Sequence, residues 1–227
     1  MSNVPFVPNA NDEIHCMQAC YAMTINALLG EQTDSIDVEF ESGFRPGHRS
    51  WPFASICSWA KRGLAVWTLD LFEADRFAAD PVREVQSWFS PDDPEGQRLV
   101  HESELEKEGS RVREALATGN VRFEKRVPTV DDLSELADWP ETALIARVNH
   151  RVLMGRDGVY GHFVIVYKVD DEHIWVQDPG PPSRPEFAYE REVFLRAWQY
   201  PSPQAAELIV VGDAANRRLS AGTSQTS

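Results

Sequence analysis

The sequence is short of basic residues. Its 227 residues include 22 Lys and Arg against 36 Asp and Glu, which gives a formal net charge of -14. A charge of this sign repels the phosphate backbone of nucleic acids and an anionic membrane surface alike. We therefore expect neither as a partner. The acidity is typical of a solvated surface, although it would also attract a cationic peptide or amine.

Long apolar runs are also missing. No stretch of about 18 consecutive apolar residues occurs, and residues 1–10 lack the basic and apolar segments of a signal peptide. Cysteine is scarce, because only Cys16, Cys20 and Cys57 are present. An odd number without a framework spacing suits a reducing compartment and leaves at least one free thiol. We expect a cytoplasmic protein.

What is present suffices for a folded core. Hydrophobic residues make up 42% of the chain and charged residues 26%, both near the average for soluble proteins. The length favours one domain, which we place at residues 1–211. The small, polar tail at residues 212–227 is predicted to be disordered. Nothing in the sequence indicates an oligomeric state.

The first half of the chain has a helical pattern. Apolar residues recur at helical spacing from Cys16 to a stop at Gly30, and a second helix is predicted to start near Ser50 and Pro52 and to end at Gly63. A short helix near residues 35–41 and a strand over residues 64–70 are also expected. A charged, helical insertion follows at about residues 74–126. It is either a solvated segment or a cap over a substrate.

The second half has mainly the period of strands. Thr129 and Asp132 resemble a capping box that opens a short helix to residue 137. Residues 143–148, 162–169, 174–177 and 207–211 then read as strands, with a helix over residues 189–198. Helices followed by an antiparallel sheet define an α+β class, in which the helical N-terminal half packs against the sheet and leaves a cleft between them.

Cys16 is the candidate nucleophile. It stands where the first helix begins, so its sulfur lies near unpaired backbone N–H groups and the positive end of the helix dipole. Both favour the thiolate, and a neighbouring imidazolium lowers a thiol pKa further. Cys20 and Cys57 lie inside apolar helical patterns and are interpreted as small buried residues.

His162 and Asp178 are the candidate partners of Cys16. His162 begins one predicted strand and Asp178 ends the next, across a turn at residues 170–172. If these strands pair antiparallel, His162 faces approximately residues 178–180, within reach of a cross-strand contact. The carboxylate would then fix the imidazole tautomer and stabilise the imidazolium. Each residue alone could equally be an ordinary strand-end or turn residue.

A metal site is not expected. Cys16 and Cys20 are four residues apart on a helix and could share one face, but no second Cys or His pair at ligand spacing occurs. No cofactor is expected either.

These residues resemble a known family. Residues 16–23 read Cys-Met-Gln-Ala-Cys-Tyr-Ala-Met, similar to the Cys-Gly-Pro-Ala-Cys-Leu-Ala-Met pattern of papain-like cysteine peptidases typified by bacteriocin double-glycine leader peptidases and their freestanding relatives. Residues 161–166, followed by Asp178-Pro179-Gly180, are similar to the second half of that family. The resemblance implies a papain-like fold and a hydrolase that cleaves a peptide or related amide through a thioester, with Cys16, His162 and Asp178 as its catalytic triad.

The chain also departs from the pattern. Met17 stands where the family has glycine, and the upstream glutamine of the oxyanion hole is absent. Asn11 is the nearest candidate for that donor, with Asn9 as the other. Losing one such donor typically costs roughly 100-fold to 1000-fold in rate. The alternatives are therefore a catalytically impaired papain-fold protein that binds a peptide, or an amide-forming acyltransferase. Without an ATPase phosphate-binding loop, coupled export is not expected.

Overall fold

The helices predicted for the first half are present in the computed structural model, which describes residues 4–10 and 14–223. Helix α1 (Cys16–Leu29) buries residues on all its sides over its first three turns and ends at Gly30, whose φ of 71° is the left-handed conformation that glycine adopts most easily. Helix α3 (Phe53–Lys61) starts after Pro52 as predicted, and the short α2 (Glu39–Ser42) precedes it.

One sheet of seven strands forms the centre of the molecule. Its spatial order is β2-β1-β7-β3-β4-β5-β6. All neighbouring strands are antiparallel except β1 and β2, which are parallel. The strands are β1 (Val66–Asp70), β2 (Val121–Lys125), β3 (Thr142–Asn149), β4 (Gly161–Val169), β5 (His173–Asp178), β6 (Arg184–Glu190) and β7 (Glu207–Gly212).

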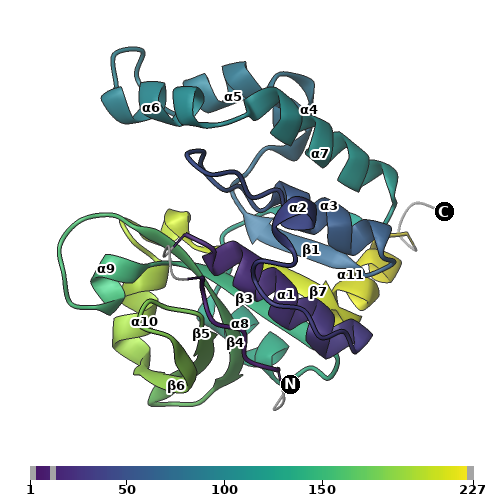
Figure 1. Cartoon of the computed structure of the whole chain (residues 1–227), viewed down its shortest axis with the longest axis vertical. Coiled ribbons are helices and arrows are strands. Elements are labelled where there is room, and N and C mark those ends of the chain that lie inside the picture. The colour runs from purple at the N-terminus through teal and green to yellow at the C-terminus, as the bar shows by residue number, and fades with distance from the viewer. Residues whose placement is uncertain (1–3, 11–13, 224–227) are drawn as a thin grey trace.

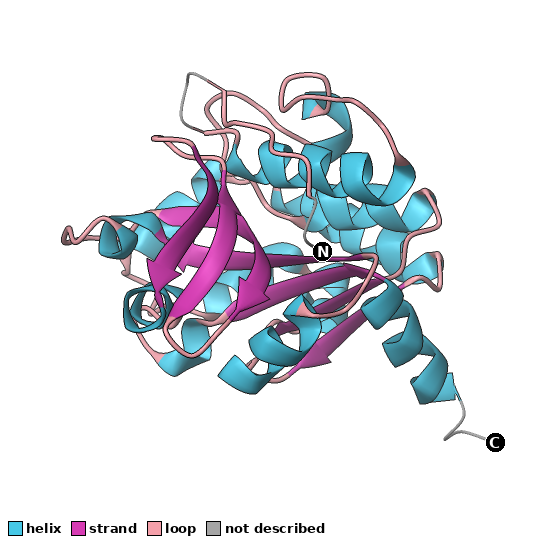
Figure 2. Ribbon diagram, turned by 90° about the horizontal axis from the view of Figure 1, so that it is seen from below, coloured by secondary structure: helices cyan, strands magenta, loops and turns pink. Residues whose placement is uncertain are grey.

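Both faces of the sheet are covered by helices, as Figure 2 shows. Successive strand residues point to opposite faces. On β3, Ile145 therefore joins the core beneath α1 and α3, while Leu144 and Ala146 join the core on the other face. That second core is covered by α8 (Val130–Ala137), α10 (Arg191–Trp198) and α11 (Asp213–Thr223). The central strands β7, β3 and β4 are thus buried on two sides, which explains their nearly continuous apolar sequences.

The charged segment after β1 forms four helices. They are α4 (Ala74–Ala79), α5 (Pro81–Ser87), α6 (Pro94–Glu102) and α7 (Leu105–Ala117). Asp80 and Asp93 cap α5 and α6 with their side chains, and a proline follows each cap at the first helical position. Figure 1 shows the four helices together at one end of the molecule, beyond α2 and α3.

The capping box is confirmed at the start of α8. Thr129 Oγ1 accepts from the backbone N–H of Asp132, and the Asp132 carboxylate accepts from the backbone N–H of Thr129. The remaining short elements are the single-turn helix α9 (His150–Leu153), which follows β3 directly, and the 3-10 turn η1 (Pro203–Ala205).

Three details differ from the sequence-based expectation. The tail is not disordered from residue 212, because residues 213–223 form α11; Ala214 and Ala215 are buried there and Arg218 pairs with Glu124. Residues 121–125 pair with β1 instead of continuing a helical insertion. Tyr189 belongs to β6, and the helix after it starts at Arg191. Each difference depends on contacts with distant residues, which local sequence patterns do not encode.

Candidate functional site

The first residue of α1 carries a half-buried thiol at the end of the sheet. Cys16 lies beside His162, the second residue of β4, and the hydrogen bonding and charge of that ring act to lower the pKa of the thiol. The backbone N–H groups of Met17 and Phe163 act in the same direction. The sulfur therefore lies where helix α1 and strand β4 both begin.

These contacts separate Cys16 from the other two cysteines. Burial acts to raise the pKa of Cys16, but the hydrogen bond and charge of His162 and the two N–H donors outweigh it, so the pKa is lowered. Burial raises the pKa of Cys20 well above its usual value, and the neighbouring Cys16 and Asp178 add to the effect. The pKa of Cys57 is raised by burial as well. Thiolate character is thus favoured at Cys16 alone.

The structure brings His162 and Asp178 together. Antiparallel pairing of β4 and β5 sets Ile165 opposite Gln177 and so places the start of β4 beside the end of β5. His162 Nε2 lies 2.7 Å from Asp178 Oδ1, and both side chains are almost wholly buried. Burial acts to lower the pKa of His162, yet its bonds to Asp178 and Cys16 raise it to about 9. Since Asp178 occupies Nε2, Nδ1 is the ring nitrogen left for Cys16.

Asp178 has two further donors that sequence reasoning missed. The backbone N–H of Gly180 donates to Oδ1 at 2.9 Å, and the Tyr189 hydroxyl donates to Oδ2 at 2.6 Å. Burial acts to raise the pKa of Asp178, but His162 and these donors lower it overall. The Asp-Pro-Gly turn could have suggested the Gly180 contact. Nothing in the sequence indicated Tyr189, because β6 itself was not predicted.

Asn9 connects the two halves of the site. Its backbone N–H donates to Pro179 O and its side-chain Nδ2 to Gly180 O, both at 2.8 Å. Its Oδ1 accepts from the backbone N–H of His15 at 2.8 Å. Asn9 therefore joins the residue before Cys16 to the turn after Asp178. The other predicted oxyanion donor, Asn11, lies outside the described residues.

A second histidine packs against the first. The rings of His150 and His162 lie 5.0 Å apart between centroids, and His150 Nε2 is buried without a hydrogen-bond partner among the residues that the structure describes. Burial and the positive charge of His162 lower the pKa of His150. It therefore packs beside the site as a neutral ring, and the sequence analysis did not single it out.

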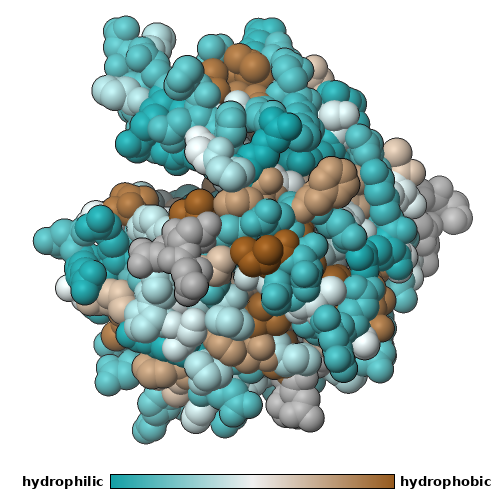
Figure 3. Space-filling view, viewed as in Figure 1, coloured by the Kyte–Doolittle hydropathy of each residue, from teal (hydrophilic) through white to brown (hydrophobic). Residues whose placement is uncertain are grey.

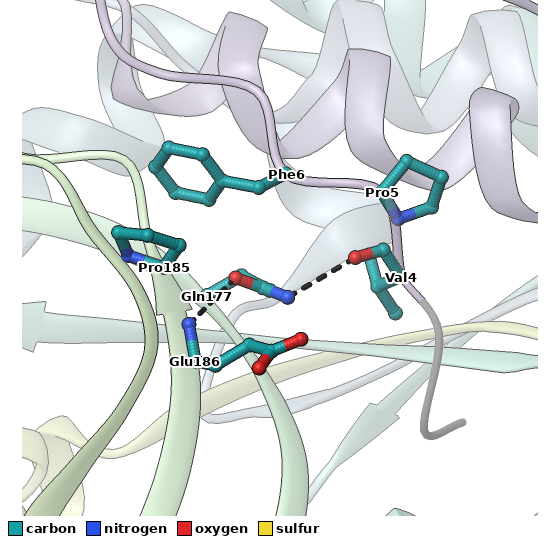
Figure 4. Close-up of a pocket in the computed structure, with 6 residues that line it drawn as sticks. All are labelled: Val4, Pro5, Phe6, Gln177, Pro185 and Glu186. Atoms are coloured by element: carbon teal, nitrogen blue, oxygen red, sulfur yellow. Dashed lines mark hydrogen bonds between the residues drawn. The ribbon is translucent and has the colours of Figure 1, made fainter.

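The surface is hollowed in more than one place. Figure 3 shows a notch between the α4–α7 helices and the part of the molecule that carries α9 and α10. A different pocket, of about 460 Å³, is drawn in Figure 4 and lies between the N-terminal segment and β5–β6. Gln177 faces this pocket and bonds Val4 O and the backbone N–H of Glu186. The residues that line this pocket include none of Cys16, His162 and Asp178, so it is separate from the site of Cys16.

Within residues 4–10 and 14–223, no group of three or more His, Cys, Asp and Glu side chains is arranged to hold a metal ion. None of the helices in the described part of the chain is long and apolar enough to span a bilayer.

Comparisons with known proteins agree with this fold. Residues 95–201, just under half of the chain, match the model of the Peptidase C39 family. The matched range contains His162 and Asp178 but not Cys16. A search of curated proteins found no match. Among solved structures, the peptidase domain of Streptococcus ComA, a bifunctional ABC transporter involved in a quorum-sensing pathway, is similar with a TM-score of 0.51 at 11% identity. The alignment covers 92% of this chain and 98% of that domain.

The fold therefore belongs to the papain-like α+β class, as expected. Within that class, residues 95–201 of the chain are similar to the Peptidase C39 family, which confirms the resemblance seen in the sequence.

Proposed function

We propose that Cys16, His162 and Asp178 form the catalytic triad of a hydrolase that cleaves a peptide or related amide bond. The observation that carries the proposal is the contact between Cys16 and His162, in which the thiol pKa is lowered and the imidazole pKa is raised. A thiol pKa that is lowered and an imidazole pKa that is raised in the same contact together favour a thiolate–imidazolium ion pair at neutral pH. Residues from distant parts of the chain make that pair.

The proposed reaction has two steps. The Cys16 thiolate attacks the amide carbonyl carbon, and the tetrahedral intermediate expels the amine as the His162 imidazolium gives it a proton. This leaves a thioester on Cys16 and a neutral imidazole. His162 then takes a proton from water, whose hydroxide attacks the thioester, and the acid product departs as the Cys16 thiolate and the imidazolium are restored.

The other residues have supporting roles in this proposal. Asp178 holds the imidazole in one tautomer through Nε2 and stabilises its positive charge. The backbone N–H of Cys16, at the start of α1, is the proposed oxyanion donor, with the Asn11 amide as the second candidate. The three cysteines are free, which suits the reducing cytoplasm as the proposed location.

Selective alkylation tests the proposal. Iodoacetamide is expected to modify Cys16 far faster than Cys20 or Cys57, as measured by mass spectrometry of digested protein at successive times. His162→Ala should abolish the difference, whereas His173→Ala, which removes a half-exposed histidine at the start of β5, should retain it. Equal rates at all three cysteines in the unmodified protein would refute the triad.

Two alternatives share this site. Met17 and the missing glutamine favour a peptide-binding protein without turnover, which would leave Cys16 unlabelled by electrophilic peptide probes while peptide still bound. An acyltransferase would resolve the same thioester with an amine. A panel of electrophilic peptides, followed by turnover assays with and without an added amine, separates the three functions and samples sequence preference.

A further inference from the structure

The carboxylate of Asp178 is bound by more donors than its contact with His162 requires. It is fully buried, and it accepts from His162 Nε2, from the Gly180 N–H and from the Tyr189 hydroxyl. The contact with Tyr189 Oη is the shortest of the three, at 2.6 Å. A buried carboxylate stays ionised only when hydrogen bonds and charges compensate for the lost water. The tyrosine supplies part of that compensation.

Arg184 fixes the direction of the tyrosine hydroxyl. Its Nη1 donates to Tyr189 Oη at 3.1 Å. A guanidinium has donors but no acceptor, so Tyr189 must accept from Arg184, and its own hydrogen is left to point at Asp178. Burial and the negative charge of Asp178 raise the pKa of Tyr189 above its usual value. The hydroxyl therefore keeps its proton across the neutral range.

Strand β6 places both residues. Arg184 lies directly opposite Asp178 in the β5–β6 register, and Tyr189 lies further along the same strand. The guanidinium packs 4.9 Å from the centroid of the Phe187 ring and its Nη2 lies 3.3 Å from Met154 Sδ. It has no ion pair with a carboxylate within the described residues, although the chain carries an excess of them. Its polar contact with Tyr189 is thus its link to the site.

We propose that Tyr189, oriented by Arg184, is a positioning residue that keeps Asp178 ionised and in one orientation against His162. This inference rests on the proposed triad and adds two members to it, so that a continuous chain of contacts runs from Arg184 through Tyr189, Asp178 and His162 to Cys16. Neither added residue touches the thiol. Both act on the stability of the thiolate–imidazolium pair, by way of the carboxylate.

The test measures the rate of alkylation of Cys16 by iodoacetamide across a range of pH. In Tyr189→Phe the ring and its packing remain, but the carboxylate loses one donor. The pKa of Asp178 then rises, so that as the pH falls the carboxylate is protonated, and its support of the His162 imidazolium is lost, at a higher pH. The acid limb of the rate profile is the low-pH range in which the alkylation rate rises with pH. We expect this limb to shift to higher pH by about one unit, so that at a given pH within it alkylation is about tenfold slower. Tyr167→Phe, on strand β4 of the same sheet, is the matched control and should leave the profile in place.

Arg184→Met supplies a second, independent arm. It should shift the acid limb in the same direction but less, because its hydrogen bond is to the Tyr189 hydroxyl and not to the carboxylate itself. In the double variant with Tyr189→Phe, the shift should equal that of Tyr189→Phe alone, since the two changes interrupt one chain of contacts. Thermal unfolding of each variant establishes that the compared proteins are folded. If Tyr189→Phe does not fold, the shift in Arg184→Met decides the proposal by itself.

The outcomes are distinct. An acid limb that stays in place or moves to lower pH in Tyr189→Phe, an equal shift in Tyr167→Phe, or additive shifts in the double variant would each overturn the positioning role. If Cys16 of the unmodified protein is no more reactive than Cys20, the triad itself fails. If Cys16 is selectively reactive and Tyr189→Phe matches the unmodified protein, the triad stands and only this inference fails.

Discussion

At the scale of single residues, the surroundings of a sulfur decide whether it can react. Cys16 and Cys20 lie one turn apart on α1, yet the pKa is lowered at the first and raised at the second. Burial acts in the same direction on both. Only Cys16 has the imidazole of His162 and two backbone N–H donors to compensate for it, so one helical turn separates a reactive thiol from an inert one.

The raised pKa of His162 predicts a specific pH dependence. Its imidazolium persists up to a pH of about 9, and only the protonated ring can give a proton to a leaving amine. Hydrolysis of an amide substrate should therefore fall as the pH rises through about 9. Alkylation of Cys16 by iodoacetamide should not fall there, because iodide leaves without a proton and the thiolate persists. Rate profiles for the two reactions, measured on one preparation, check this; a parallel decline in both would contradict it.

At the scale of elements, aromatic side chains attach the insertion to the rest of the molecule. Phe77 of α4 lies 5.1 Å from Phe53 of α3 and from Phe72 after β1, and 5.7 Å from Trp51, between ring centroids. Phe72 in turn lies 5.8 Å from Phe123 of β2. The helices α4–α7 thus share a core with α3 and the sheet. This is the packing of a fixed part of the domain, not of a lid that moves separately.

Removing the central ring of this cluster should destabilise the whole protein. Phe77 is fully buried, and Phe→Ala changes in cores cost about 3–5 kcal/mol of unfolding free energy. Phe77→Ala should lower the free energy measured by urea denaturation by that amount. Phe40→Ala is the matched control, because Phe40 is 95% exposed and its loss should change little. Equal stabilities of the two variants would show that the insertion is not part of the common core.

At the scale of the whole molecule, the site exists only where distant segments meet. Cys16 comes from the first helix, while His162 and Asp178 come from strands near the other end of the chain. Asn9 joins them by bonding the residue before Cys16 and the turn after Asp178. No local segment holds the thiol and the imidazole together by itself.

Unfolding should therefore abolish the reactivity of Cys16 and the secondary structure together. As urea is raised, the preference of iodoacetamide for Cys16 over Cys57 and the far-ultraviolet circular dichroism should decline with one midpoint, as a cooperative transition requires. Loss of the preference at a clearly lower urea concentration would show that the contact between the start of α1 and strands β4 and β5 opens locally before the fold is lost.

The sequence by itself was enough for the features that depend on near neighbours. The helical spacing of apolar residues and Gly30 define α1, Thr129 and Asp132 define the start of α8, and the spacing across the β4–β5 turn predicts that His162 and Asp178 meet. These features are encoded locally, because caps, turns and the register of a hairpin are set within a few residues.

The tertiary structure alone decided the rest. Tyr189 reaches Asp178 because β6 pairs with β5, α11 forms because Ala214 and Ala215 are buried against the sheet, and the parallel β1–β2 pair joins segments separated by the whole insertion. In each case the stabilising partner lies far away in the chain, and burial against it outweighs a weak or contrary local preference. For that reason the local sequences of residues 184–190 and 213–223 do not by themselves predict strand β6 and helix α11.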